Sequence, residues 1–248
     1  MKLLQILNVI ALLATLLVNG LANSLPINGQ TTGEVSDSIP SLFTPAGYVF
    51  SIWGLIYLGL AAYAIYQILP KQRDKPFIGR IGYWFVSSSV FNILWLFAWH
   101  YEQFLLSIVA MLGLLGSLLV LYVRLGIGRD AVPVLDRALV HLPFSIYLGW
   151  ISVATIANAS TVLVVMGWNG FGISPELWTA MMVAIAAVLG IAMIWQRQEI
   201  AYPLVIVWAL VGISVKQAGV PLITMSTWVS ALAVLVALGW SRLRTRKE

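Results

Sequence analysis

Three apolar stretches of this 248-residue sequence carry aromatic and amide side chains at intervals of three and four residues. Such intervals place side chains on one face of a helix. The members that could contact one ligand are Trp53 and Tyr57 in the first stretch, Asn92 and Trp95 in the second, and Tyr147, Trp150, Ala154 and Asn158 in the third. Aromatic rings stack on flat ring systems with an offset, an amide would orient a polar edge, and an alanine would leave room for the ring. The stripes therefore predict a site for a flat, apolar ligand.

The same side chains have a second, structural interpretation. Tryptophan is enriched at membrane interfaces, and the tryptophans that fit this role, near the ends of apolar segments, are Trp84, Trp99, Trp168 and Trp240. An amide within hydrocarbon must find a partner, because an unmet polar group there is costly, and a neighbouring helix commonly supplies one. Helix packing and ligand contact both remain open for the inner tryptophans and the two asparagines, and the two can coexist.

No arrangement typical of catalysis is visible in the sequence. There is no cysteine, the acidic residues fall in loops or at segment ends, and His100 and His141 are expected near opposite membrane faces. We therefore expect no metal site and no required cofactor, and enzyme activity stays open. The lack of a mid-membrane carboxylate also disfavours a proton-driven transporter.

Lys216 invites comparison with the Schiff-base lysine of retinal proteins, but without a counter-ion in the bundle we interpret it as a lysine whose ammonium reaches water at the interface.

The elements that position these residues are apolar segments long enough to cross a bilayer. Hydrophobic residues make up 60% of the chain and charged residues only 9%, against about 25% in soluble domains, so lipid must be the solvent. Eight segments approach the ~20 residues that span hydrocarbon as a helix, at residues 2–22, 45–69, 81–99, 104–124, 139–165, 177–195, 200–216 and 220–240. The sequence thus predicts an all-α integral membrane protein, a polytopic helical bundle with about eight transmembrane helices.

The basic residues predict the orientation of this bundle. With eight spans, every lysine and arginine except Lys216 falls on the side that holds both termini. Because cytoplasmic loops carry the Lys/Arg excess, we expect both termini in the cytoplasm and the protein in the plasma (inner) membrane. The first segment also resembles a secretory signal peptide, although its length favours a retained helix. The basic tail is interpreted as an orientation signal and weak lipid anchor, and no nucleic-acid partner is expected.

Three motifs together resemble a known membrane family. FTPAGYVFSIWGLIYLGLAAY (residues 43–63), FNILWLFAW (91–99) and YLGWISVATIAN (147–158) are similar, in order, to the second, third and fifth helices of the translocator protein / tryptophan-rich sensory protein (TspO/MBR) family. The resemblance covers about residues 1–165. It implies a five-helix bundle that binds a large flat molecule, such as a porphyrin or a sterol, in a cavity closed by the first long loop, residues 23–44.

The chain also departs from the five-helix pattern. Ile146 stands where the family has proline, and Pro143 lies one turn earlier, so we expect any kink to shift toward the N-terminus. The segments at about 177–240 have no counterpart in the five-helix members. We therefore predict a TspO-like five-helix transmembrane core at residues 1–165 and three additional transmembrane helices with a basic cytoplasmic tail at residues 166–248.

These observations predict a membrane ligand-binding or sensory protein. It would bind a tetrapyrrole- or sterol-like molecule and modulate the transport, breakdown or signalling of that molecule, with a porphyrin as ligand rather than cofactor. Two alternatives stay open: a small-solute membrane transporter, although no inverted repeat is evident, and light-driven or enzymatic tetrapyrrole chemistry with tryptophans as electron donors. Besides lipid and a hydrophobic small molecule, a second copy of the chain is a candidate partner, because Gly113 and Gly116 suit close helix contact.

Overall fold

The computed structural model describes residues 3–25 and 27–245, and within them the chain forms helices and loops without a strand. Eight long helices are α1 (Leu3–Ser24), α3 (Ile52–Ile68), α5 (Trp84–His100), α6 (Phe104–Leu125), α8 (Leu142–Val165), α9 (Pro175–Arg197), α10 (Ala201–Lys216) and α11 (Pro221–Thr245). Each corresponds to one predicted segment. By length and composition, six helices of the described chain could cross a membrane, whereas α5 and α10 are shorter, at 17 and 16 residues. The predicted all-α membrane bundle is confirmed.

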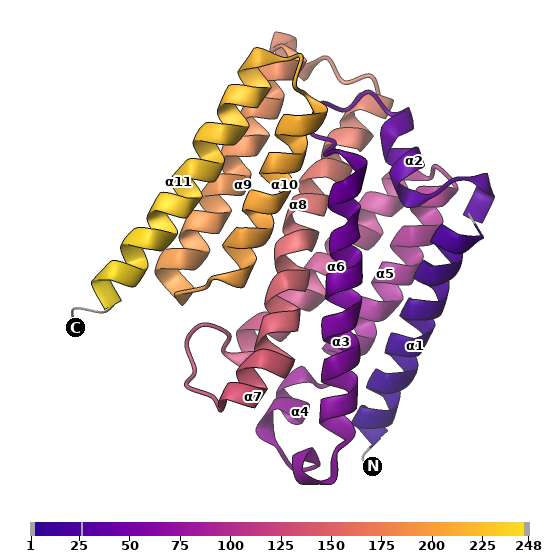
Figure 1. The fold of residues 1–248 in the computed structure, drawn as a ribbon. Coiled ribbons are helices and arrows are strands. Elements are labelled where there is room, and N and C mark those ends of the chain that lie inside the picture. Colours follow the sequence, from indigo (N-terminus) through magenta and orange to yellow (C-terminus); the bar gives the residue numbers. More distant parts are fainter. Residues whose placement is uncertain (1–2, 26, 246–248) are drawn as a thin grey trace.

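Five of these helices form a ring, and the other three lie outside it (Figure 1). Around the ring, α1 packs against α5, α5 against α6, α6 against α8, α8 against α3, and α3 against α1. Helix α10 packs on the outer side of α8, and α9 and α11 pack on α10. One large core of buried apolar residues runs through both groups, and a second, smaller cluster lies between α9 and α11. The proposed division into two domains at residue 165 stays a prediction.

Short helices connect the long ones. They are η1 (Ile27–Gly29), α2 (Thr32–Ser38), η2 (Gly47–Ser51), η3 (Pro70–Gln72), α4 (Pro76–Ile81), α7 (Val134–Asp136), η4 (Arg137–His141) and η5 (Gly170–Gly172). Helix α2 lies in the first long loop, where Thr31 and Glu34 form a reciprocal cap at its start. The loop is folded against the end of α5, because Val35 is buried and the Trp99 indole donates to the Thr32 carbonyl oxygen at 3.2 Å.

The path into α8 is irregular where the sequence predicts a shifted kink. The turn Arg137–His141 has π geometry and directly precedes Leu142 and Pro143. Pro143 has no N–H and its ring crowds the preceding turn, so a regular α-helix cannot continue through it from the N-terminal side. Gly59 of α3 faces this proline, and a Cβ there would come within 3.1 Å of the Pro143 ring. The proline therefore displaces the irregularity toward the N-terminus and marks the close crossing of α3 and α8.

The added helices are attached to the ring through η2 as well as α8. The Ala46 amide donates to the Gly212 carbonyl oxygen of α10 at 3.0 Å, and the Trp208 indole donates to the Val49 carbonyl oxygen at 3.2 Å. Gly212 is required for this approach, because a Cβ there would collide with the Val49 side chain. At the end of α10, Lys216 pairs with Asp37 of α2 at 2.7 Å, and both side chains are partly exposed. The lysine is thus held at the surface.

We expect Gly212→Val to lower the free energy of unfolding by about 1–3 kcal/mol, the usual cost of overfilling a packed contact. Thermal unfolding of the purified protein in detergent measures the effect. Gly54→Ala in α3 is the matched control, because a Cβ at Gly54 meets no atom within 4 Å. Equal stability of the two variants would contradict the close η2–α10 contact.

Candidate functional site

Five of the eight predicted site residues are aromatic, and their rings meet inside the five-helix ring, around Trp53. Trp53 stacks on Tyr57 with ring centroids 5.3 Å apart and an interplanar angle of 19°. It also lies 6.5 Å from Trp95 of α5 and makes edge contacts with two α8 rings, at 5.9 Å to Tyr147 and 6.2 Å to Trp150. The structure therefore brings together the aromatic members of three helices that are distant in sequence. We call these five rings the aromatic cluster.

Asn92 joins this cluster to α1 by a buried chain of hydrogen bonds. The Asn19 amide donates to the Asn92 side-chain oxygen at 2.8 Å, and the Asn92 amide donates to the Tyr147 hydroxyl at 3.1 Å. All three side chains are buried. In hydrocarbon such bonds have no competing water, so they fix the relative positions of α1, α5 and α8.

Asn158 is held in the same way, by α5 and α6. Its side-chain oxygen accepts from the Trp95 indole at 3.1 Å, and its amide donates to the Ser107 hydroxyl at 2.9 Å. The structural interpretation of both asparagines is thus realised, since each bonds protein groups. These bonds also set the plane of the Trp95 ring and the position of the Tyr147 ring.

Two polar atoms of the site have no hydrogen bond of normal geometry within the described residues. They are the indole nitrogen of Trp150 and the hydroxyl oxygen of Tyr57, and both atoms are buried. A buried donor without a partner is uncommon and calls for an explanation. Ala154 lies one turn beyond Trp150 on α8 and is half-buried, as are Trp53 and Tyr57. The half-buried residues of the site therefore lie beside the two polar atoms that have no hydrogen-bond partner among the described residues.

Sequence reasoning missed Asn19 and Ser107, the partners of the two asparagines. It also missed a second buried network, in which the Asn8 amide donates to the Tyr63 hydroxyl at 3.0 Å and the Gln67 side-chain oxygen at 3.1 Å, and the Gln5 amide donates to the Gln67 backbone. The signal was present in the first apolar segment, where Gln5, Asn8, Thr15 and Asn19 recur at intervals close to whole helical turns.

A large cavity lies elsewhere, in a groove between α3, α8 and α10. Its volume is about 910 Å³, and none of the eight predicted site residues lines it. Its walls are apolar, with Leu55 of α3, Ile146 of α8, and Leu204 and Trp208 of α10. One end is formed by the loops that follow α6 and α9. We call this feature the lateral groove.

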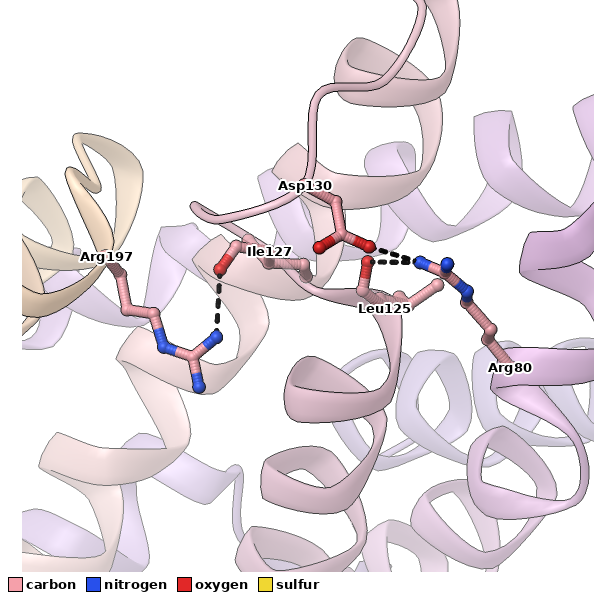
Figure 2. A network of polar contacts seen from close by, with 5 residues as sticks. All are labelled: Arg80, Leu125, Ile127, Asp130 and Arg197. Atoms are coloured by element: carbon pink, nitrogen blue, oxygen red, sulfur yellow. Dashed lines mark hydrogen bonds and ion pairs between the residues drawn. The ribbon is translucent and has the colours of Figure 1, made fainter.

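Two arginines fix the loop at this end of the groove (Figure 2). From α4, Arg80 donates to the Asp130 carboxylate at 2.6 Å and to the Leu125 carbonyl oxygen at 3.4 Å. From the other side, Arg197 at the end of α9 donates to the Ile127 carbonyl oxygen at 3.4 Å. Gly128 permits this approach, because its φ is +76° and a Cβ there would collide with the Arg197 backbone. The loop is therefore a built part of the groove wall.

Glu199 lies at the same end, in the loop between α9 and α10. Its carboxylate accepts a hydrogen bond from the Ser145 hydroxyl of α8 and another from the Tyr202 amide at 3.5 Å. Burial raises the pKa of the Glu199 carboxyl above its ordinary value, and these bonds oppose the rise. The loop between α9 and α10 thus places a half-buried carboxyl group in contact with α8.

We expect the Asn158–Ser107 bond to contribute about 0.6 kcal/mol and no more than about 1.7 kcal/mol, the average and the maximum for hydrogen bonds between membrane helices. A double-mutant cycle with Asn158→Ala and Ser107→Ala measures this coupling as non-additive losses in unfolding free energy. Ser160→Ala is the control, because that hydroxyl donates to Ile156 in its own helix. Strictly additive losses would show that the two side chains do not interact.

Glu199 should make stability depend on pH. A carboxyl whose folded pKa is raised favours folding most below its unfolded pKa, and this contribution is lost as pH rises through the folded pKa. Thermal unfolding in detergent at a series of pH values measures the melting temperatures of Glu199→Gln and of the parent. The variant's melting temperature should rise relative to that of the parent from about pH 4.5 upward, and the difference should then level off. Glu102→Gln, at an exposed loop position, is the control for removal of one carboxylate. A difference that does not change with pH would contradict the raised pKa.

Comparisons with known proteins agree with this architecture. The family described as TSPO-like protein matches residues 5–240, which includes the last three helices as well as the five-helix ring. A search of curated proteins and a search of solved structures gave no match. The family match spans most of the 248 residues and both groups of helices, and it agrees with the motifs on α3, α5 and α8. The chain therefore belongs to the TSPO-like protein family of integral membrane proteins.

Proposed function

We propose that this protein binds a large, flat, apolar molecule of tetrapyrrole or sterol type against the aromatic cluster, and that binding modulates the transport, breakdown or signalling of that molecule. The observation that carries the proposal is the pair of unsatisfied atoms, the Trp150 nitrogen and the Tyr57 oxygen, within a cluster of stacked and edge-on rings. Membership of a TSPO-like family supports a general ligand-binding or sensory role in the membrane.

The contacts assign different tasks to the site residues. Trp53 and Tyr57 would present ring faces to the ligand, and the Trp150 N–H would donate to a polar edge. Asn92 and Asn158 already bond Tyr147 and Trp95, so they would act first by holding those rings and would bond ligand only by exchanging a partner. Ala154 would leave space beside Trp150. Ligand entry would require Trp53 to move, because it touches four rings of the cluster.

We further propose the orientation indicated by the charges, with both termini in the cytoplasm and the chain in the plasma (inner) membrane. A homodimer is a separate proposal. Gly113 is occupied within the chain, since a Cβ there would collide with the Phe91 ring at 2.5 Å, whereas Gly116 meets no atom within 4 Å. A close contact between two copies would therefore use the Gly116 face of α6.

Titration of the detergent-purified protein with protoporphyrin should give saturable quenching of tryptophan fluorescence at micromolar concentrations. Trp150→Phe, which removes the free donor, should weaken binding about tenfold, the factor that corresponds to ~1.4 kcal/mol for one hydrogen bond. Asn158→Ala, which releases the Trp95 ring, should weaken it as well.

Trp228→Phe is the matched control, because it removes one exposed tryptophan of α11 far from the cluster in sequence. Quenching that does not saturate and is equal in all variants would mean that porphyrin only partitions into the micelle. Saturable uptake of a small solute into proteoliposomes, without equilibrium binding, would then favour a transporter.

A further inference from the structure

The lateral groove combines two chemistries that do not occur together in the aromatic cluster. Toward mid-membrane its walls are large apolar side chains, and several of them are also exposed on the outer surface of the bundle, among them Leu55, Leu204 and Trp208. In a membrane these side chains face lipid. Its volume of about 910 Å³ lies within the range of small-molecule sites. The groove is therefore open to molecules dissolved in the bilayer.

Arginines line the other end of the groove, near the loops after α6 and α9. They are Arg129, Arg137, Arg197 and Arg242. Arg129 and Arg137 form no ion pair within the described residues, and the Arg242 Nε is buried without a hydrogen-bond partner. Each guanidinium has five N–H donors, whereas Arg242 and Arg197 donate one hydrogen bond each within the described residues, to the Gln198 and Ile127 carbonyl oxygens. Donors for an anion therefore remain at this end.

The two carboxylates that also line this end are fewer than its four arginines. Asp130 pairs with Arg80, which comes from α4 and does not line the groove. Glu199 accepts hydrogen bonds from the Ser145 hydroxyl and the Tyr202 amide, and the charge of Arg242 opposes the rise that burial causes in the pKa of its carboxyl. Within the described residues, Arg129 and Arg137 keep their full charge for an anion. The open end is therefore basic, on the side where the sequence places the cytoplasmic Lys/Arg excess.

From this arrangement we infer that the lateral groove binds an anionic phospholipid, with its phosphate at Arg137 and Arg242 and an acyl chain along Ile146, Leu204 and Trp208. Guanidinium groups bind phosphate oxygens in pairs, and basic pockets between helices on the cytoplasmic side suit anionic headgroups. A soluble phosphate compound would leave the apolar walls unfilled, and a neutral lipid would leave the guanidinium donors unused. The site is separate from the aromatic cluster, and it does not depend on the proposed ligand of that cluster.

Trp208 provides a direct readout. The protein is placed in phosphatidylcholine nanodiscs with a rising fraction of phosphatidylglycerol whose acyl chains are brominated, and bromine quenches nearby tryptophan. The fluorescence difference between the parent and Trp208→Phe isolates the signal of Trp208. We expect this signal to be quenched with saturation at a low fraction of the anionic lipid, whereas brominated phosphatidylcholine at the same fraction should give a weak, non-saturating effect.

Arg137→Gln and Arg242→Gln should each raise the half-saturating lipid fraction about tenfold. Arg244→Gln is the matched control, since it removes the same charge from an exposed position of α11 outside the groove. An equal shift in all three variants would reduce the effect to general attraction of anionic lipid and overturn the site. Competition by millimolar glycerol 3-phosphate would indicate a soluble phosphate ligand and would overturn the assignment of a lipid to the groove. Equal quenching by the two brominated lipids would show that the groove does not select an anionic headgroup, and would also overturn the proposal.

Discussion

The arrangement of the five-helix ring depends on one constraint: polar side chains buried in a lipid-facing bundle must find their partners inside the protein. Asn19, Asn92 and Tyr147 satisfy one another across α1, α5 and α8. Asn158, Trp95 and Ser107 do so across α8, α5 and α6. Each bond joins elements far apart in sequence, so each also fixes a register. The orientation of the aromatic rings follows from these registers.

The membrane architecture and the meeting of the aromatic stripes were predictable because both depend on local pattern. Apolar length identified the eight helices, and the stripes of three and four residues brought Trp53, Trp95 and Trp150 to one place. The partners of the asparagines were not predictable in the same way. For a lone serine such as Ser107 in an apolar run, the sequence does not indicate which neighbouring helix the side chain faces. The spacing of the asparagines in the first segment predicts that they share one face of the helix, but not which residues they contact.

The lateral groove was beyond reach of the sequence for a different reason. A groove is the space left between helices, so it depends on how α3, α8 and α10 diverge and on where loops return. The placement of α10 and of the loop after α6 depends on close contacts, among them Gly212 against Val49 and Gly128 against the backbone of Arg197. Single glycines in an apolar sequence do not reveal which backbone they will meet. The arginines, by contrast, were visible, but their distribution first indicated only orientation.

The packing of α10 on α8 changes the character of α8 itself. A helix in a simple ring keeps one flank toward lipid, yet seven consecutive residues of α8, from Tyr147 to Val153, are all buried. Gly149, directly beside Trp150, is so close to α10 that a Cβ would come within 3.1 Å of Val205. Helix α8 is thus surrounded by protein on all sides over these two turns and has no face exposed to lipid there. A hydrophobic molecule that diffuses in the bilayer has no path along that stretch to Trp150, and the three outer helices thereby restrict the directions from which the aromatic cluster can be approached.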